Sequence, residues 1–336
     1  MIQISIFDMI REPIRITKPI RLIELFAGYG SQAMALKRIG AKFEHYRVVE
    51  FDKYAIASYN AVHGTSFPTM DITKVHAEDL NICDTEVFTY LLTYSFPCTD
   101  LSVAGKQAGM KKGSGTRSGL LWEVERILKE IRDGGGELPQ ILFMENVPQV
   151  HANANMEDFQ NWIDFLTSLG YVSYWQDLNA KNYGVAQNRE RCFMFSFLGE
   201  YNYHNMTELE PRQDNISNTM TTVQKDNLLL ENNIQKVGQI SSDGSQRGTV
   251  ISDNGISANL VAGTHGYANS HIATKYRIRK LTPRECGRLM GVSDEDISKM
   301  AAVNSNTQLY KQFGNSIVVD VMCAMFRNLN IEQEVK

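Results

Sequence analysis

Residues 20–30 read IRLIELFAGYG, and the fold follows from this stretch. Its first part, 20–26, is an apolar run that predicts a buried strand. Glycines follow at Gly28 and Gly30, and a helical pattern covers 31–39 before the next glycine. A buried strand, a glycine-containing turn and a helix form the first unit of a doubly wound α/β sheet, where ligands bind at the carboxyl ends of the strands.

The same alternation continues to about residue 198. The expected further strands are 46–50, 90–96, 140–144, 171–178 and 192–198, and the expected helices between them include 52–63 and 156–169. Alternating strands and helices predict a parallel sheet with helices on both faces. We therefore expect a Rossmann-like doubly wound α/β domain.

Beyond that point the sequence becomes rich in Asn, Ser, Thr and Gly, and helical patterns are almost absent until 282–291 and 307–328. Short strand-like pieces occur at 248–252 (GTVIS) and 258–263 (ANLVAG). Three parts are expected: a catalytic and cofactor domain 1–198, a smaller irregular β-rich domain 199–276, and a C-terminal segment 277–336 that returns to the first domain.

Composition narrows the class of protein. The chain has 336 residues, of which 43% are hydrophobic and 21% charged, as in globular proteins. No apolar stretch is long enough to span a membrane, and charges and prolines interrupt the N-terminus, so a cytoplasmic protein is expected. The five cysteines are scattered and no pair has metal-ligand spacing, so no metal is expected. The net charge of -4 means that any nucleic-acid-binding charge must be local.

The turn after the first strand predicts a nucleoside site without a phosphate cradle. The dinucleotide fingerprint needs a third glycine, but Ala33 stands there. Glu50 ends the second strand about 20 residues later, where a carboxylate binds ribose hydroxyls. Ordinary turns also contain such residues, so the prediction depends on their combination; S-adenosylmethionine fits it. The expected contacts are Phe26, Ala27, Gly28, Tyr29, Gly30, Glu50, Phe51 against the adenine, and Asp71 at its amino group.

Cys98 follows an apolar strand directly, in the sequence SFPC. An isolated cysteine is usually a small buried apolar residue. Here, however, residues 101–122 contain five glycines, four basic residues and no acid. Positive charge lowers the pKa of a thiol and also suits a phosphate backbone, so the segment predicts a nucleophile beside a mobile basic loop. The basic residues are Lys106, Lys111, Lys112 and Arg117.

Two further groups are expected near Cys98. Glu145 ends the 140–144 strand, and a partly desolvated carboxyl group there would have a raised pKa and could donate a proton. Arg189 and Arg191 are alternate residues at the entrance of the 192–198 strand, so they point to one face. That face could bind a carbonyl oxygen or hold Glu145, although a charged strand entrance of no function has the same pattern.

Six segments resemble the cytosine-5 DNA methyltransferase family, in the family's order: FAGYG, SFPC, ENV, QNRER, RKLTPREC at 279–286 and FGNS at 313–316. The resemblance implies an enzyme that transfers a methyl group from S-adenosylmethionine to carbon 5 of cytosine in double-stranded DNA. Cys98 would attack carbon 6 of a flipped-out base. Glu145 would engage ring nitrogen 3, Arg191 the carbonyl oxygen, and Arg189 would support them. The resemblance adds Ile72, Pro97, Leu120, Asn315 and Ser316 to the cofactor site.

The family pattern is broken at two positions: Thr99 replaces the usual Gln after Pro-Cys, which puts loop closure in doubt, and Ser31 replaces a glycine. Residues 200–275 correspond to the variable target-recognition region. Base-reading candidates there are Gln246, Arg247, Thr264 and His265, and the basic segment that follows is the better candidate for backbone contacts. That segment comprises Arg277, Arg279, Lys280, Arg284 and Arg288.

Several alternatives stay open. A tRNA cytosine methyltransferase has the same scaffold, and a non-catalytic DNA-binding homologue would also keep the fold. A nicotinamide oxidoreductase is disfavoured by the missing third glycine. The sequence does not give the recognition site, nor whether a restriction endonuclease accompanies the protein or a phage encodes it. A monomer is expected.

Overall fold

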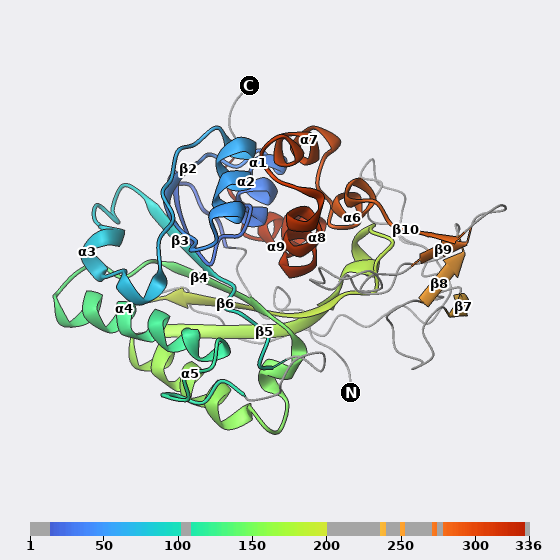
Figure 1. The fold of residues 1–336 in the computed structure, drawn as a ribbon. Helices are drawn as coiled ribbons and strands as arrows, with labels where there is room; N and C mark the ends of the chain where they lie inside the picture. Colours follow the sequence, from blue (N-terminus) through green and yellow to red (C-terminus); the bar gives the residue numbers. More distant parts are fainter. Residues whose placement is uncertain are drawn as a thin grey trace, which may run out of the picture.

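The computed structural model describes residues 14–101, 109–199, 236–239, 249–252, 271–273 and 278–332. Within these residues the chain forms a six-stranded sheet in the order β2-β1-β3-β4-β6-β5 and a separate four-stranded sheet (Figure 1). The strands of the large sheet are β1 (Ile20–Leu25), β2 (Phe43–Val49), β3 (Thr89–Tyr94), β4 (Ile141–Asn146), β5 (Tyr171–Asn179) and β6 (Glu190–Leu198).

The first four strands are parallel, as the sequence predicts. Every residue of β3 and β4 is buried, because helices cover both faces. Figure 1 shows α4 and α5 on one face and α1, α2 and the C-terminal helices on the other. The helices of this part are α1 (Ser31–Arg38), α2 (Lys53–His63), α3 (Ala77–Leu80), α4 (Leu121–Asp133) and α5 (Met156–Ser168).

The prediction of an all-parallel sheet is wrong at one edge. Strand β6 lies between β4 and β5 and runs antiparallel to both. Only residues 180–189 join β5 to β6, and a parallel crossover needs about a dozen or more residues. The short connection therefore turns the chain back on itself, and Asn179 pairs directly with Glu190.

The C-terminal segment returns to the large sheet, as expected, but its helical pattern is divided differently. Four helices occur among its residues 278–332, and the expected helix 307–328 is broken at residues 316–318, where the backbone is extended. Helix α9 packs in the same core as α1, β1 and β6. The helices are α6 (Pro283–Leu289), α7 (Asp294–Val303), α8 (Asn306–Asn315) and α9 (Val319–Arg327).

The second sheet has the order β10-β9-β8-β7 and lies apart from the large sheet, beyond α6 (Figure 1). The predicted strand at 248–252 is confirmed as β8, whereas the piece at 258–263 lies outside the described residues. Strands β8 and β9 are parallel and the other two pairs are antiparallel. The strands are β7 (Lys236–Gln239), β8 (Thr249–Ser252), β9 (His271–Ala273) and β10 (Ile278–Lys280).

Among the described helices, none combines the length and the apolar character needed to cross a bilayer.

Candidate active site

The predicted catalytic residues converge where β3 and β4 end side by side. Tyr94 of β3 pairs with Met144 of β4, so the chain leaves both strands at the same edge. Asn146 fixes the two ends: its side-chain amide donates to the carbonyl oxygen of Phe96 (2.9 Å), and its side-chain oxygen accepts from the Val147 amide (2.8 Å). The SFPC and ENV segments are thus held together by a buried amide.

Glu145 and Arg191 form an ion pair at this edge. Arg191 Nε lies 3.2 Å from Glu145 Oε1, and both side chains are almost fully buried, at 11% and 9% exposure. Burial raises the pKa of the Glu145 carboxyl group, and the charges of Arg191 and Arg189 partly oppose this effect. The predicted direction of the shift is confirmed, and the carboxyl group is poised to carry a proton.

Cys98 is partly buried and lies within electrostatic reach of Arg191, Glu145 and Arg189. Burial raises the pKa of its thiol, Arg191 and Arg189 lower it, and Glu145 raises it further. The expected lowering of this pKa is wrong: burial raises it, and the cations that oppose burial most among the described residues are Arg191 and Arg189, at the entrance of β6.

The chain after Cys98 is held by a compact set of hydrogen bonds. Ser118, in the 3-10 helix η3 (Ser118–Leu120), donates its hydroxyl to the Pro97 carbonyl (2.7 Å). Asp100 accepts from the backbone amides of Arg117 (2.8 Å) and Ser118 (3.3 Å). The two ends of the basic loop are thereby joined beside Cys98, although residues 102–108 lie outside the described residues.

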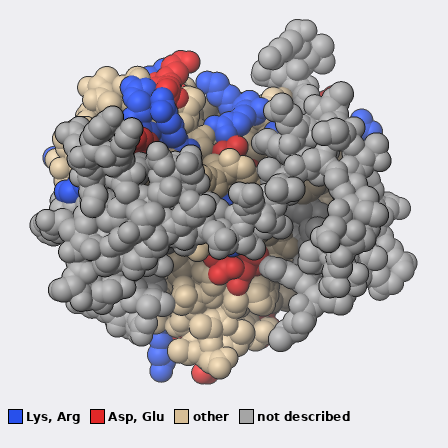
Figure 2. All heavy atoms as spheres, turned by 90° about the vertical axis from the view of Figure 1, so that its right-hand side faces the viewer, with Lys and Arg blue, Asp and Glu red and all other residues tan. Residues whose placement is uncertain are grey.

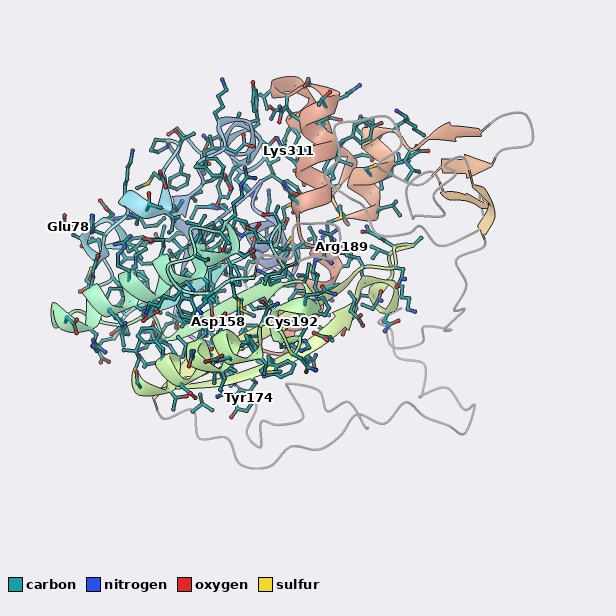
Figure 3. The ribbon with its side chains drawn as sticks, turned by 60° about the horizontal axis from the view of Figure 1, so that its bottom comes forward. Glu78, Asp158, Tyr174, Arg189, Cys192 and Lys311 are labelled. Carbon is teal, nitrogen blue, oxygen red and sulfur yellow. The ribbon has the colours of Figure 1, made fainter. Side chains whose placement is uncertain are left out.

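Arg189 is buried and joins the strand entrance to the C-terminal helices. Its guanidinium donates to the carbonyl oxygens of Gly314 (3.0 Å) and Ser316 (2.6 Å). Figure 3 shows Arg189 toward these helices, with Cys192 farther along the sheet. The Ser316 hydroxyl also contacts that of Ser31 (2.6 Å), so the FGNS segment meets the first turn of α1. This is the return of the C-terminal segment that the sequence predicts.

The glycine turn after β1 has the geometry of a close-approach site. Gly28 has φ +58°, and a Cβ added there would meet nothing within 4 Å. Gly30 has φ +82°, and its Cβ would lie 2.4 Å from His63 Nε2. Phe26 also has a positive φ of 59°, a strained conformation that is frequent at ligand sites. Space is thus open at Gly28, whereas Gly30 is required by the packing beneath it.

Glu50 shapes this turn from the neighbouring strand. Its carboxylate accepts from the backbone amides of Gly28 (2.9 Å) and Asp52 (2.8 Å). A carboxylate has about four acceptor positions, and the Phe51 amide also contributes a hydrogen bond, so acceptor capacity remains for a hydroxyl group of a ligand. Burial raises the pKa of Glu50, and these amide hydrogen bonds oppose the shift. The open space at Gly28 and the acceptor positions of Glu50 together fit a nucleoside cofactor.

The other predicted cofactor residues are distributed around this turn. Tyr29 packs its side chain into the core against Phe313 (5.8 Å between ring centroids), so only its backbone is left to face a ligand. Phe51 is 74% exposed and available for stacking. Asp71 accepts from Thr73 at both its amide (3.1 Å) and hydroxyl (2.9 Å). Of the remaining members, two are buried (Ala27 and Ile72), three are partly buried (Pro97, Leu120 and Ser316) and one is exposed (Asn315).

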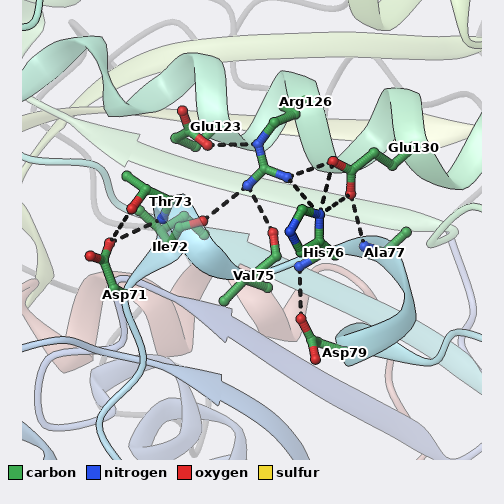
Figure 4. Close-up of polar contacts among 10 residues, drawn as sticks. All are labelled: Asp71, Ile72, Thr73, Val75, His76, Ala77, Asp79, Glu123, Arg126 and Glu130. Carbon is green, nitrogen blue, oxygen red and sulfur yellow. Dashed lines mark hydrogen bonds and ion pairs between the residues drawn. The ribbon is translucent and has the colours of Figure 1, made fainter.

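Arg126 is a positioning residue that the sequence reasoning missed. From α4 it donates to the carbonyl oxygens of Ile72 (3.1 Å) and Val75 (2.8 Å), as Figure 4 shows. It also pairs with Glu123 (2.7 Å) and Glu130 (2.6 Å) on its own helix. The arginine therefore fixes the segment after Asp71 to α4. Its i-3 and i+4 acidic neighbours are the only sequence signal, and they are common on solvated helices.

The structure describes only some of the residues that are predicted to contact DNA. Lys111 and Arg117 are exposed, but Lys112 pairs with Glu125 (2.6 Å), so its charge is matched within the protein. Arg284 lies 3.6 Å from Asp294, and Arg288 binds the same carboxylate at 2.7 Å. Figure 2 shows the face that lies on the right-hand side of Figure 1. At the top of that face, Lys and Arg side chains lie together with acidic side chains among them. Candidates outside the described residues or side chains are Lys106, Gln246, Arg247, Thr264, His265, Arg277 and Arg279.

The fold defines the class first: it is the class I S-adenosylmethionine-dependent methyltransferase fold. A solved Dnmt2 methyltransferase from S. pombe matches with a TM-score of 0.66 at 20% identity, over 92% of this chain and 98% of that one. A solved methyltransferase from Entamoeba histolytica, EhMeth, matches with a TM-score of 0.67 at 17% identity, over 93% and 98%. At such low identity these likenesses concern the fold.

The family follows from sequence: the chain belongs to the C-5 cytosine-specific DNA methylases, whose model matches residues 20–330. The type II methyltransferase M2.ScrFI of Lactococcus lactis is 32% identical over 92% of this chain and 99% of its own length. The type II methyltransferase M.HhaI of Haemophilus parahaemolyticus is 30% identical over 90% and 92%. The orphan methyltransferase M.SssI of Spiroplasma monobiae is 31% identical over 92% and 97%.

Proposed function

We propose that the protein methylates carbon 5 of a flipped-out cytosine within a specific sequence of double-stranded DNA, through a covalent bond to Cys98. The observation that carries the proposal is the buried Glu145–Arg191 pair within electrostatic reach of the Cys98 thiol. A proton carrier, a fixed cation and a nucleophile at one sheet edge are the groups that addition to a pyrimidine ring requires.

The chemistry of this chain's residues follows from their charges. The thiol proton of Cys98 passes to water as Sγ forms a bond to carbon 6, and Glu145 delivers a proton to ring nitrogen 3, so that the added electron pair is held in the ring. Arg191 binds the carbonyl oxygen of the base, and Arg189 keeps the strand entrance in place. Carbon 5 then becomes nucleophilic, and S-adenosylmethionine supplies the methyl group when bound. Water accepts the proton from carbon 5 and Glu145 takes back the proton from ring nitrogen 3, so the bond to Cys98 breaks and the product is released.

Because the pKa of Cys98 is raised in the resting structure, we infer that DNA binding helps to activate the thiol. In the resting structure the thiol is protonated, because burial outweighs the two arginines. Closure of the loop over DNA would bring the exposed cations Lys111 and Arg117 toward the substrate and change the surroundings of the sulfur. The proposed target-recognition region is 199–276, which contains most of the second sheet, and the proposed backbone contacts include Arg279 and Arg284.

The biological setting is restriction–modification or protective methylation. Two of the relatives above are named type II methyltransferases and one is named an orphan methyltransferase. We propose double-stranded DNA as the partner, with a cognate restriction endonuclease as a functional partner in the first setting. The proposed assembly is a monomer in the cytoplasm.

The test uses the full chain in two stages. Bisulfite sequencing of DNA from a host that expresses the wild-type protein identifies the methylated sequence. A duplex with that sequence and 5-fluorocytosine at the target position then traps the covalent intermediate. We expect Cys98→Ser to lose the trapped complex and to reduce methylation by several orders of magnitude.

Cys83→Ser is the matched control, because Cys83 is a partly buried thiol remote from Glu145 in the fold, and it should keep both activities. Methylation by Cys98→Ser at the wild-type rate would overturn the covalent mechanism. Labelled transfer to tRNA but not to duplex DNA would favour the RNA substrate instead.

A further inference from the structure

Three side chains of the types that bind transition metals meet on the sheet face opposite Glu145. They are His151, at the end of the 3-10 helix η4 (Pro148–His151), Asp177 of β5 and Cys192 of β6. Asp177 and Cys192 are register partners in neighbouring strands. The ligand atoms of all three residues lie within 4.8 Å of one another. The methyl-transfer site uses none of them.

Alternation along β6 separates this cluster from the catalytic residues. Arg191 faces Glu145, whereas Cys192, the next residue, packs in the core that contains α4 and α5. Figure 3 shows Cys192 within the sheet. Cys192 is the register partner of Asn146, the residue directly after Glu145. The cluster therefore lies at the same end of β4 as Glu145, but on the opposite face of the sheet.

We propose that His151, Asp177 and Cys192 form a binding site for one Zn²⁺ ion, with water as the fourth ligand. Thiolate, imidazole and carboxylate are the three ligand types of protein zinc sites, and ligand atoms in a tetrahedral site lie about 3.3–3.6 Å apart. His151 Nε2 is 2.9 Å from Asp177 Oδ1 and 3.0 Å from Oδ2. The ligands therefore need to move by less than about 1.5 Å to reach that geometry.

The site is open on one side and supported on the other. The side chains of His151 and Asp177 are 19% and 24% exposed, which leaves a path for the ion and a place for the water, while Cys192 is fully buried. The imidazole of His151 packs against the indole of Trp175 at 4.4 Å between centroids. Packing of this kind fixes the plane of a ligating ring before the metal arrives.

The hydrogen bonds in the structure describe the metal-free form of such a site. His151 and the Cys192 thiol both contact the Asp177 carboxylate. Zn²⁺ would displace the thiol proton to solvent, and the proton between His151 and Asp177 would leave or move to Nδ1. The ion would replace hydrogen bonds by metal–ligand bonds across η4, β5 and β6, and so stiffen the strand that carries Arg191. The proposal is independent of the proposed methylation mechanism.

Cobalt(II) is the probe for the test, because it takes zinc sites and reports a thiolate ligand by a sulfur-to-metal charge-transfer band. Metal-free protein with the Cys98→Ser substitution, which removes the catalytic thiol, is titrated with Co²⁺. We expect one equivalent to give the band and one equivalent of Zn²⁺ to abolish it. Cys192→Ser should lose the band.

Cys83→Ser is the control, because the Cys83 thiol also lies near a carboxylate, at 3.6 Å from Asp84, yet belongs to no such cluster within the described part of the chain. It should keep the band. His151→Gln and Asp177→Asn change partly exposed side chains, so they test the site even where a change at buried Cys192 prevents folding; both should lose the band or the 1:1 stoichiometry. No charge-transfer band in the parent protein, or a band that survives Cys192→Ser, would overturn the proposal.

Discussion

At the scale of single residues, the two glycines of the FAGYG turn serve different purposes. Both have a positive φ, which non-glycine residues adopt at a cost of roughly 1–2 kcal/mol. Only Gly30 also lacks room, since its Cβ would lie 2.6 Å from Tyr59 Cε2 and closer still to His63. Gly28 faces open space, where the proposed cofactor binds. The sequence shows two equal glycines, and the structure separates their roles.

This difference predicts different outcomes for Gly30→Ala and Gly28→Ala. We expect Gly30→Ala to lower the free energy of unfolding by about 2–5 kcal/mol, because strain adds to overpacking. Gly28→Ala should cost only about 1 kcal/mol and instead raise the KM for S-adenosylmethionine, because its methyl group occupies cofactor space. Urea unfolding and steady-state kinetics of the pair measure both effects. Equal stabilities of the two variants would show that the side chains of Tyr59 and His63 can move to accommodate a methyl group at Gly30, and would contradict this prediction.

At the scale of elements, α4 holds the segment that follows Asp71. Arg126 donates two hydrogen bonds to backbone carbonyls of that segment and is itself paired with two glutamates. The proposed cofactor contacts Asp71 and Ile72 therefore depend on a helix that contributes no proposed cofactor contact of its own. This dependence is testable because α4 carries a second arginine in a different setting.

We expect Arg126→Met to raise the KM for S-adenosylmethionine roughly 10-fold, because lost charge-assisted hydrogen bonds release the segment. The kcat should change little, since the catalytic groups lie at other strand ends. Arg132→Met is the matched control: Arg132 is exposed and pairs with the neighbouring Asp133, so both constants should stay at their wild-type values. A fall in kcat with an unchanged KM would contradict the positioning role.

The strands and helices also show which parts of the fold can be predicted from the sequence. Apolar runs and glycine stops predict the parallel strands and the helix 52–63 closely; Asp52 caps that helix (2.9 Å to the Tyr54 amide) and Gly64 ends it with φ +69°. Both signals are local. The reversal of β6 and the break at 316–318 depend on tertiary contacts, which periodicity does not contain. Pairing of the Lys112 charge with Glu125 was hidden for the same reason.

The residues of the candidate site also fall into those that local motifs predict and those that depend on tertiary contacts. Cys98, Glu145 and the two arginines follow from motifs placed at strand ends, and the structure brings them together. Arg126 and the His151 cluster escape this reasoning because their partners are far apart in sequence: Asp177 and Cys192 meet only through strand register. Cysteine spacing alone predicted no metal, since it tests for pairs of cysteines and not for mixed ligand sets.

At the scale of the whole molecule, a buried acid beneath the cofactor turn affects stability. Glu24 is fully buried, and burial raises its pKa to about 7, although Tyr59 and the Ala33 amide oppose the shift. Tyr59 donates its hydroxyl to Glu24 Oε2 (2.5 Å) and contacts His45, whose pKa burial lowers to about 4. The folded protein therefore favours the protonated form of this acid more than the unfolded chain does.

The sign of the pH dependence follows. A raised folded-state pKa gives stability that is present below the ordinary value of 4.5 and is lost as the pH rises through about 7. We expect Glu24→Gln, which keeps an acceptor for Tyr59, to become more stable relative to wild type between pH 5 and pH 8, by on the order of 3 kcal/mol. Denaturant unfolding at several pH values measures the difference. A difference that does not vary with pH would show that Glu24 titrates normally.

The contact between the Ser31 and Ser316 hydroxyls has a consequence for biosynthesis. The two partners are 285 residues apart in the sequence, so this wall of the turn is absent until the later segment has been synthesised. A ribosome-bound intermediate can pair its first strands but cannot enclose a ligand at Gly28. Polypeptides that stop before α8 would therefore lack a closed cofactor site under the proposed function.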